Sequence, residues 1–193
     1  MTSESSNTGV APSLRIARKS DLDEIMRLEH EGFSKATWET RETFEERLSN
    51  FNDGFWVISE MSGKLHGYLC AEIWHFSQIW KPTNFALNHG AGEAHVPSGE
   101  EVYVSSMTID GASRGLGLGR LLFIGSLVAM FNAYPNLMST ILMVSGEWKH
   151  AKNIYDAAGF VEIGSMDRYF TGVDGERHKA VVMRRVGKVL EVK

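Results

Sequence analysis

Glycines are concentrated in one short segment of this 193-residue sequence. Five of its 19 glycines lie between Gly111 and Gly125. The segment falls between an expected strand and an apolar helix, so its glycines allow a tight turn and direct free backbone N–H groups outward. A helix N-terminus carries about half a positive charge, which favours an anion such as a pyrophosphate. The residues expected to contact this anion are Arg114, Gly115, Leu116, Gly117, Leu118, Gly119 and Arg120.

Two common phosphate motifs do not fit this turn. The dinucleotide-binding fingerprint requires a third glycine where the sequence has Arg120, and the P-loop requires a lysine that does not follow Gly119. The alternative to a phosphate-binding role is a turn whose glycines serve tight packing alone.

A second motif lies about 40 residues downstream and reads Tyr-Asp-Ala-Ala-Gly-Phe over 155–160. Together with Arg114-x-x-Gly117-x-Gly119, it resembles the GNAT superfamily of N-acetyltransferases, which bind acetyl-CoA. The resemblance runs from about Leu14 to Val186. Within the superfamily the chain is most similar to arylalkylamine (serotonin-type) enzymes and their microbial relatives, through Glu29-x-x-x-Phe33 and segments 54–57 and 64–68.

The resemblance implies acetyl-CoA as co-substrate. The glycine turn would hold its pyrophosphate, and the pantetheine arm would pair in the manner of a strand with the backbone of Met107, Thr108 and Ile109. A backbone N–H near Met107 would then face the thioester carbonyl oxygen and stabilise the oxyanion.

Tyr155 is the expected general acid. It shares one helical face with Trp148, Ala151 and Ala158. Such a tyrosine is usually a core aromatic residue, but its place in the second motif favours a catalytic role. A phenol (pKa near 10) is protonated at neutral pH and can donate to a departing thiolate (pKa near 8.5).

The proton acceptor is harder to assign. An alkylamine has a pKa near 10.4, so a deprotonation route lowers the barrier by up to roughly 4–5 kcal/mol at pH 7. Strand alternation places Glu101, Tyr103, Ser105 and Met107 on one face, although a bulge would reset this parity. In serotonin-type enzymes two histidines match Tyr103 and Ser105, and in the histone-acetylating branch a glutamate matches Tyr103. We expect Glu101, or a water held by Tyr103 and Ser105, to remove the proton; alternatively, Glu101 is a solvated carboxylate at the strand end.

Aromatic residues are expected to wall the acceptor pocket: Phe33, and Trp74, Phe76, Trp80 and Phe85 around the start of the irregular stretch 75–99. The function expected is direct acetyl transfer from acetyl-CoA to a small primary amine, an arylalkylamine or a polyamine. The alternatives are a peptide or protein N-acetyltransferase and a non-catalytic acyl-CoA-binding module.

The periodicity of apolar residues predicts the elements that position these groups. Ser20 is expected to cap a helix bearing Leu22, Ile25 and Phe33, and the irregular stretch 75–99 is expected to form a substrate-side flap. The expected strands cover 14–18, 55–60, 64–74, 101–109, 139–144, 160–163, 168–170 and 178–186; the expected helices cover about 20–33, 44–51, 118–132 and 148–158. This order predicts an α/β fold, and the resemblance specifies a GNAT fold with a mixed, mostly antiparallel sheet of six to seven strands and about four helices.

Composition narrows the class of protein further. Twenty basic and 24 acidic side chains give a net charge of −4, which disfavours nucleic acid as a partner. No apolar run is long enough to span a membrane, and the single cysteine, Cys70, excludes an intramolecular disulfide. His89 and His95 lack a third ligand, so no metal is expected. We expect a flexible tail over 1–12, one domain over 13–193 and a cytoplasmic location.

Overall fold

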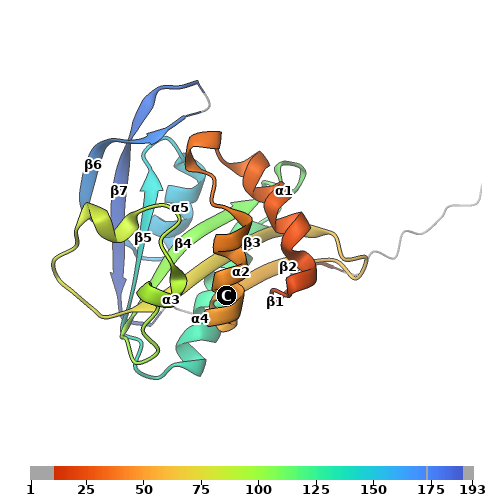
Figure 1. Ribbon diagram of the computed structural model, residues 1–193, viewed down its shortest axis with the longest axis horizontal. Coiled ribbons are helices and arrows are strands. Elements are labelled where there is room, and N and C mark those ends of the chain that lie inside the picture. Colours follow the sequence, from red (N-terminus) through yellow and green to blue (C-terminus); the bar gives the residue numbers. More distant parts are fainter. Residues whose placement is uncertain (1–10, 173, 189–193) are drawn as a thin grey trace, which may run out of the picture.

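A single seven-stranded sheet organises the protein, as seen in a computed structural model that describes residues 11–172 and 174–188 (Figure 1). The strand order is β1-β2-β3-β4-β5-β7-β6, and every neighbouring pair is antiparallel except β4 and β5. The strands are β1 (Ser13–Ile16), β2 (Phe55–Ser59), β3 (Leu65–Trp74), β4 (Glu101–Ile109), β5 (Ser139–Ser145), β6 (Val161–Thr171) and β7 (Arg177–Val186).

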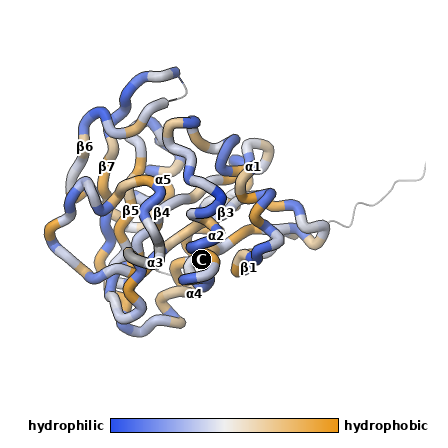
Figure 2. The backbone as a smooth tube through the Cα atoms, viewed as in Figure 1, coloured by the Kyte–Doolittle hydropathy of each residue, from blue (hydrophilic) through white to orange (hydrophobic). Residues whose placement is uncertain are grey.

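Helices cover both faces of this sheet. Helices α1 (Leu22–Gly32) and α2 (Arg41–Asn50) pack on one face, against strand residues such as Phe55 and Tyr68. Helices α4 (Leu118–Ala133) and α5 (Lys149–Ala157) pack on the other, against residues such as Val104 and Leu142. A single turn, α3 (Ala91–Ala94), lies in the connection between β3 and β4. Figure 2 shows hydrophobic segments along the central strands and a hydrophilic tip on the β6–β7 hairpin.

The α/β architecture predicted from the sequence is confirmed, with seven strands and four helices of nine residues or more among the described residues. The domain boundaries stay a prediction. Strand β1 begins at Ser13, where the domain was expected to begin, but residues 1–10 of the expected tail and 189–193 of the expected domain lie outside the described residues.

The start of the first helix differs from the prediction. A 3₁₀ turn over Lys19–Asp21 precedes α1, and Asp21, not Ser20, is the N-cap residue. The Asp21 carboxylate accepts a hydrogen bond from the Arg18 N–H (2.8 Å) and pairs with Arg15. The Asp21 side chain accepts no hydrogen bond from α1; it instead ties the 3₁₀ turn to Arg15 of β1, which satisfies both oxygens of the buried carboxylate.

The C-terminal strands and the strand β4 also depart from simple alternation. The two short strands expected between 160 and 170 form one strand, β6, whose pairing with β7 shifts register twice.

In β4, Ser106 pairs with Cys70 and Val104 pairs with Ala71, so Ser105 is an extra residue in a β-bulge. The bulge moves Met107 to the α4 face, with Val104, and places Ser106 beside Tyr68 on the α1 face. The predicted grouping of Met107 with Tyr103 is therefore wrong.

The stretch 75–99 is anchored to the sheet and is not a free flap. Phe85, at the end of a 3₁₀ turn (Pro82–Phe85), is fully buried against Trp74 and Tyr103. The Trp80 indole lies so close to Gly164 that a Cβ there would stand 2.2 Å from the ring. Only glycine is therefore compatible with this contact between the connection and β6.

A buried charge cluster ties this connection to α2 and β3. Arg47 pairs with Glu39 and with Glu72 (3.3 Å), and Glu72 also lies 2.9 Å from His89 Nε2. The other ring nitrogen of His89 faces the Ala86 carbonyl at 2.8 Å. Because both ring nitrogens face acceptors, His89 is an imidazolium; although burial lowers the pKa of His89, its hydrogen bond to Glu72 raises it overall. The cations of Arg47 and His89 thus balance the carboxylates of Glu39 and Glu72.

We predict that Arg47→Met lowers the free energy of unfolding by about 3–5 kcal/mol, since it leaves buried carboxylates without their main counter-charge. Urea denaturation would measure the loss. The control is Arg41→Met in the same helix, whose exposed guanidinium pairs with the exposed Asp23; its effect should stay below about 1 kcal/mol. Equal losses in the two variants would contradict the role given to the cluster.

Candidate active site

The two parallel strands β4 and β5 separate in the middle of the sheet. They pair only from Glu101–Ser139 to Val104–Leu142, although β4 continues to Ile109 and β5 to Ser145. Beyond that point β4 keeps its pairing with β3, but no described strand pairs with its other edge. A cavity opens between the separated strands, lined by residues 104–107 of β4 and 142–144 of β5.

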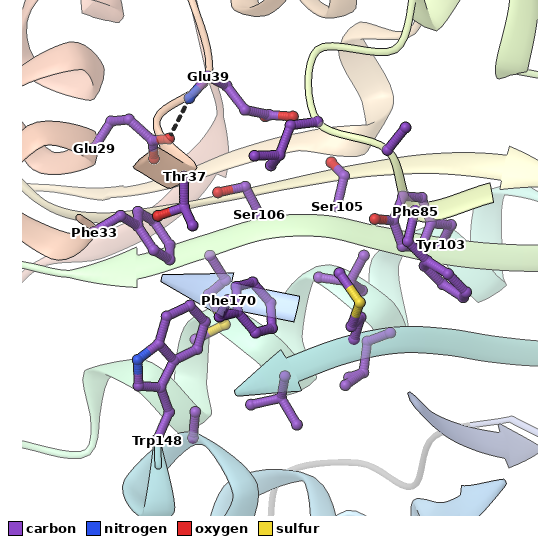
Figure 3. Close-up of a pocket in the computed structure, with 18 of the residues that line it drawn as sticks. Glu29, Phe33, Thr37, Glu39, Phe85, Tyr103, Ser105, Ser106, Trp148 and Phe170 are labelled. Atoms are coloured by element: carbon purple, nitrogen blue, oxygen red, sulfur yellow. Dashed lines mark hydrogen bonds between the residues drawn. The ribbon is translucent and has the colours of Figure 1, made fainter. Parts of the chain in front are cut away.

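Other elements close the cavity around this opening. The end of α1 supplies Glu29, and the segment that follows supplies Phe33, Thr37 and Glu39. Aromatic rings from three elements form one wall, with Trp148 5.4 Å from Phe33 and 5.1 Å from Phe170 between ring centroids. Figure 3 shows Ser105 and Ser106 on the side of β4 nearer Glu39, and Trp148 and Phe170 on the other side. The remaining lining residues are Phe85, Ala86, Leu87, Tyr103, Ala151 and Tyr155.

Several predicted site residues meet in this cavity. Phe33, Tyr103, Ser105, Met107 and Tyr155 all line it. The Ser105 hydroxyl donates to the Cys70 carbonyl (3.1 Å). Burial raises the pKa of Tyr155 above its ordinary value, with no charged or hydrogen-bonding group opposing the shift. The Tyr155 phenol therefore keeps its proton throughout the neutral pH range.

Glu101 does not reach the cavity. Its side chain is 2% exposed, and its carboxylate lies 2.7 Å from Arg184 Nε and 2.8 Å from the Ser139 hydroxyl. Burial raises the pKa of Glu101, although Ser139 and Arg184 oppose the shift. This placement contradicts both predictions for Glu101, as the proton acceptor and as a solvated carboxylate. Its polar partners lie on β5 and β7, which the spacing of residues within β4 could not reveal.

Trp74 and Phe76 are not cavity-lining residues either. The Trp74 indole stacks on Tyr103 (3.9 Å between centroids), so it supports the wall from behind. The Phe76 ring lies under the Arg184 guanidinium at 5.0 Å, away from the cavity. Of the aromatic residues expected at the pocket, Phe33 and Phe85 line the cavity, whereas Trp80 packs against Gly164. Trp148 and Phe170, which were not predicted there, complete the aromatic lining.

Glu29 is a cavity residue that the sequence prediction did not assign a role. It is 1% exposed, and its carboxylate accepts hydrogen bonds from the Glu39 N–H (2.9 Å) and the Tyr68 hydroxyl. Burial, opposed by these hydrogen bonds, raises the pKa of Glu29 to about 7. A signal was present in the sequence: Glu29 lies on the apolar face of α1, seven residues after Leu22 and four after Ile25.

The glycine turn follows directly after β4 and has the conformation that the sequence predicted. Gly115 (φ +79°) and Gly117 (φ +78°) are left-handed, and Gly117 is the N-cap of α4. The N–H groups of residues 115–120 make no backbone hydrogen bond within the described chain. Gly119 lies against Ile109, Met107 and Ile154, so the turn adjoins the end of the cavity. Arg114 and Arg120 are exposed beside it.

Two further searches of residues 11–172 and 174–188 gave negative results. No helix there combines the length and the apolar character needed to cross a membrane. No group of three or more His, Cys, Asp or Glu side chains there is arranged to hold a metal ion.

No protein-family model matches the sequence, and no curated protein matches it. Solved structures resemble the chain over nearly its whole length. Ard1 from Thermoplasma volcanium is 19% identical with a TM-score of 0.68, covering 94% of this chain and 100% of that one. The ribosomal-protein-S18-alanine N-acetyltransferase from Escherichia coli is 18% identical with a TM-score of 0.66, covering 93% and 96%. The GNAT-like decarboxylase GphF, in complex with isobutyryl-CoA, is 20% identical with a TM-score of 0.70, covering 90% and 98%. The chain therefore has the GNAT fold.

The raised pKa of Glu29 makes stability depend on pH. The pKa of Glu29 is about 4.5 in the unfolded chain and about 7 in the folded one. Between these two pH values the native state binds more protons than the unfolded state, so the free energy of unfolding falls as pH rises. The loss is on the order of 3 kcal/mol by pH 8. Uncharged Glu29→Gln avoids it, so we predict that its stability relative to wild type improves by about this amount between pH 4 and pH 8. Urea titrations at both pH values test this, with exposed Glu31→Gln as the control.

Proposed function

We propose that this protein is an acyltransferase that uses acetyl-CoA to acetylate a primary amine. One observation carries the proposal: the free edge of β4 runs from the cavity directly into a turn whose N–H groups are unbonded. An extended, amide-containing chain can pair with such an edge, and an anion can bind at such a turn. Coenzyme A has both parts in that order, a pantetheine arm and a pyrophosphate.

The residues fit this ligand. Nothing lies within 4 Å of the Cβ positions of Gly115 and Gly117, so a pyrophosphate can approach the backbone of residues 114–120. Met107, Thr108 and Ile109 would supply backbone groups to the pantetheine arm, since the β5 side of β4 has no strand partner there. An N–H near Met107 would face the thioester carbonyl oxygen at the cavity.

We assign Tyr155 as the general acid. It lines the cavity from α5, and burial keeps its phenol protonated. When the carbon–sulfur bond breaks, the phenol can give its proton to the thiolate of coenzyme A. The aromatic contacts of Tyr155 with Phe123 and Phe160 hold the ring in place.

The acceptor we propose is a small primary amine, an arylalkylamine or a polyamine, as in the serotonin-type enzymes that the sequence resembles. The aromatic wall of Phe33, Trp148 and Phe170 would pack against an aromatic or methylene chain. Glu29 also lines the cavity and has no paired cation among the described residues, so its charged form favours a cation over an anion. A cytoplasmic location suits the single, buried thiol of Cys70.

The test combines coenzyme A binding with thiol release. Calorimetry measures acetyl-CoA binding, and release of free coenzyme A is followed with tryptamine, putrescine and a set of N-terminal peptides. Saturation by tryptamine or putrescine supports the proposal, whereas saturation by peptides alone favours a peptide acetyltransferase. Binding without thiol release favours a non-catalytic acyl-CoA-binding module. Absence of binding at millimolar acetyl-CoA contradicts the proposed function.

Gly117→Val should weaken acetyl-CoA binding by about tenfold or more, because a branched side chain at positive φ distorts the turn and obstructs its N–H groups. Gly63→Val is the matched control: Gly63 has φ +89° and equally open surroundings, but it lies in the β2–β3 turn. The two variants should lose similar stability in thermal melts, while only Gly117→Val loses affinity. A similar loss of affinity in both would refute the assignment of the turn.

Tyr155→Phe should lower kcat by about 10²-fold with little change in acetyl-CoA affinity, because only the proton donor is removed. Tyr134→Phe, which loses an exposed hydroxyl bonded to Asp53, should behave like wild type. Steady-state kinetics from pH 6 to pH 10 make the comparison. Unchanged turnover and pH dependence in Tyr155→Phe would mean that Tyr155 is only a core aromatic residue.

A further inference from the structure

We infer that Glu29 is the terminal proton acceptor for the amine, and that the proton reaches it through the hydroxyls of Ser106 and Tyr68. The inference rests on the proposed acetyl transfer, because it assigns the base that this reaction needs. It replaces Glu101, which is bound to Arg184 outside the cavity.

The three groups form a continuous hydrogen-bonded path from the cavity into the core. Ser106 lies on β4 just past the bulge and lines the cavity. Its hydroxyl is 2.9 Å from the Tyr68 hydroxyl, and the fully buried Tyr68 hydrogen-bonds to the second oxygen of Glu29. The bulge at Ser105 creates this path, since without it Ser106 would face α4.

The direction of the path follows from the number of protons available. An ionised carboxylate only accepts hydrogen bonds, so Tyr68 must donate its single proton to Glu29. Ser106 must then donate to Tyr68, which leaves the lone pairs of the Ser106 oxygen free to accept from the cavity. An ammonium or amine N–H next to Ser106 would complete the path in the direction of proton removal.

Glu29 is the carboxylate best suited to end this path. Glu39 is paired with Arg47, and Glu101 with Arg184, so each carboxylate already has a guanidinium as its partner. Glu29 has no basic side chain within ion-pair distance among the described residues. The charged and titratable groups that face it are Tyr68 from β3, Glu39 from the α1–α2 connection and Arg47 from α2. The pKa of about 7 that results allows it to accept and release a proton near neutrality.

The proton balance of the step is complete. An ammonium N–H proton passes to Ser106, the Ser106 proton to Tyr68, and the Tyr68 proton to Glu29, which becomes a neutral carboxylic acid. The freed nitrogen lone pair forms the bond to the thioester carbonyl carbon. The nitrogen of the resulting tetrahedral intermediate loses its second proton to water. The carbon–sulfur bond then breaks with its electron pair on sulfur, the thiolate takes the Tyr155 proton, and water returns a proton to the Tyr155 phenolate. Glu29 returns its proton to water between turnovers.

The competing role for Glu29 is structural, because it also holds the Glu39 N–H (2.9 Å). The two roles differ in pH dependence. A structural defect lowers the rate by the same factor at every pH, whereas loss of a base matters less as the amine loses its own proton near pH 10.4.

The experiment measures kcat/KM from pH 5.5 to pH 10 for wild type, Glu29→Gln, Tyr68→Phe and the control Glu31→Gln, with acetyl-CoA and tryptamine or putrescine. In wild type the rate should rise through about pH 7 as Glu29 ionises. At pH 7 we expect Glu29→Gln and Tyr68→Phe to lose about 10²-fold, with a deficit that narrows toward pH 10. Glu31→Gln should match wild type, since Glu31 is exposed and paired with Arg27.

A Glu29→Gln profile that keeps the same limb near pH 7, or a deficit constant across pH, would overturn the relay while leaving acetyl transfer in place. Absence of acetyl-CoA binding by wild type would instead overturn the proposed function. Carboxyl-carbon NMR of the same proteins gives a readout that does not need turnover. One glutamate should titrate near pH 7 in wild type and Glu31→Gln and be missing in Glu29→Gln; no glutamate titrating between pH 6 and pH 8 would refute the assignment.

Discussion

The separation of β4 from β5 is the constraint on which the rest of the structure depends. Both strands keep their outer neighbours, β3 and β7, but lose each other after Val104 and Leu142. Unpaired backbone groups inside a sheet are costly unless another partner satisfies them. An extended ligand that pairs with the free edge of β4 would satisfy these backbone groups. The side chains beside the gap line the cavity.

Charged groups also brace the paired stretch of β4 and β5. Glu101 and Arg184 connect β4 to β7 across β5, with Ser139 as a third partner, at the start of that stretch and away from the gap. On the same face of the sheet, where Glu72 pairs with Tyr103, Arg47, Glu72 and His89 hold the connection that carries Phe85. Both clusters consist of buried carboxylates with matched cations. They fix geometry around the cavity without offering a reactive group to it.

Much of the fold could be read from the sequence because its signals are local. The helix face of α1, the two strands β2 and β3, and the tight glycine turn before α4 each follow from neighbouring residues. The site was only partly predictable, since its key features depend on contacts between distant segments. The bulge at Ser105 places Met107 on the other face from the one expected, and Arg184 holds Glu101 outside the cavity. Tyr68 hydrogen-bonds to both Glu29 and Ser106. The spacing of residues within one strand contains none of this information.

The cavity has two parts that come from different segments: one belongs to β4, and the other is carried on the anchored 75–99 connection. The half formed by β4 and the glycine turn consists of backbone, and backbone contacts depend little on which side chains are present. The half formed by Phe85, Ala86 and Leu87 is carried on a connection fixed at its ends by Trp80 and His89. Leu87 is 40% exposed and can change without disturbing the sheet, whereas Phe85 is buried against Trp74 and Tyr103. Under the proposed function, a substitution at Leu87 would change the acceptor side of the cavity and leave the co-substrate side at β4 untouched.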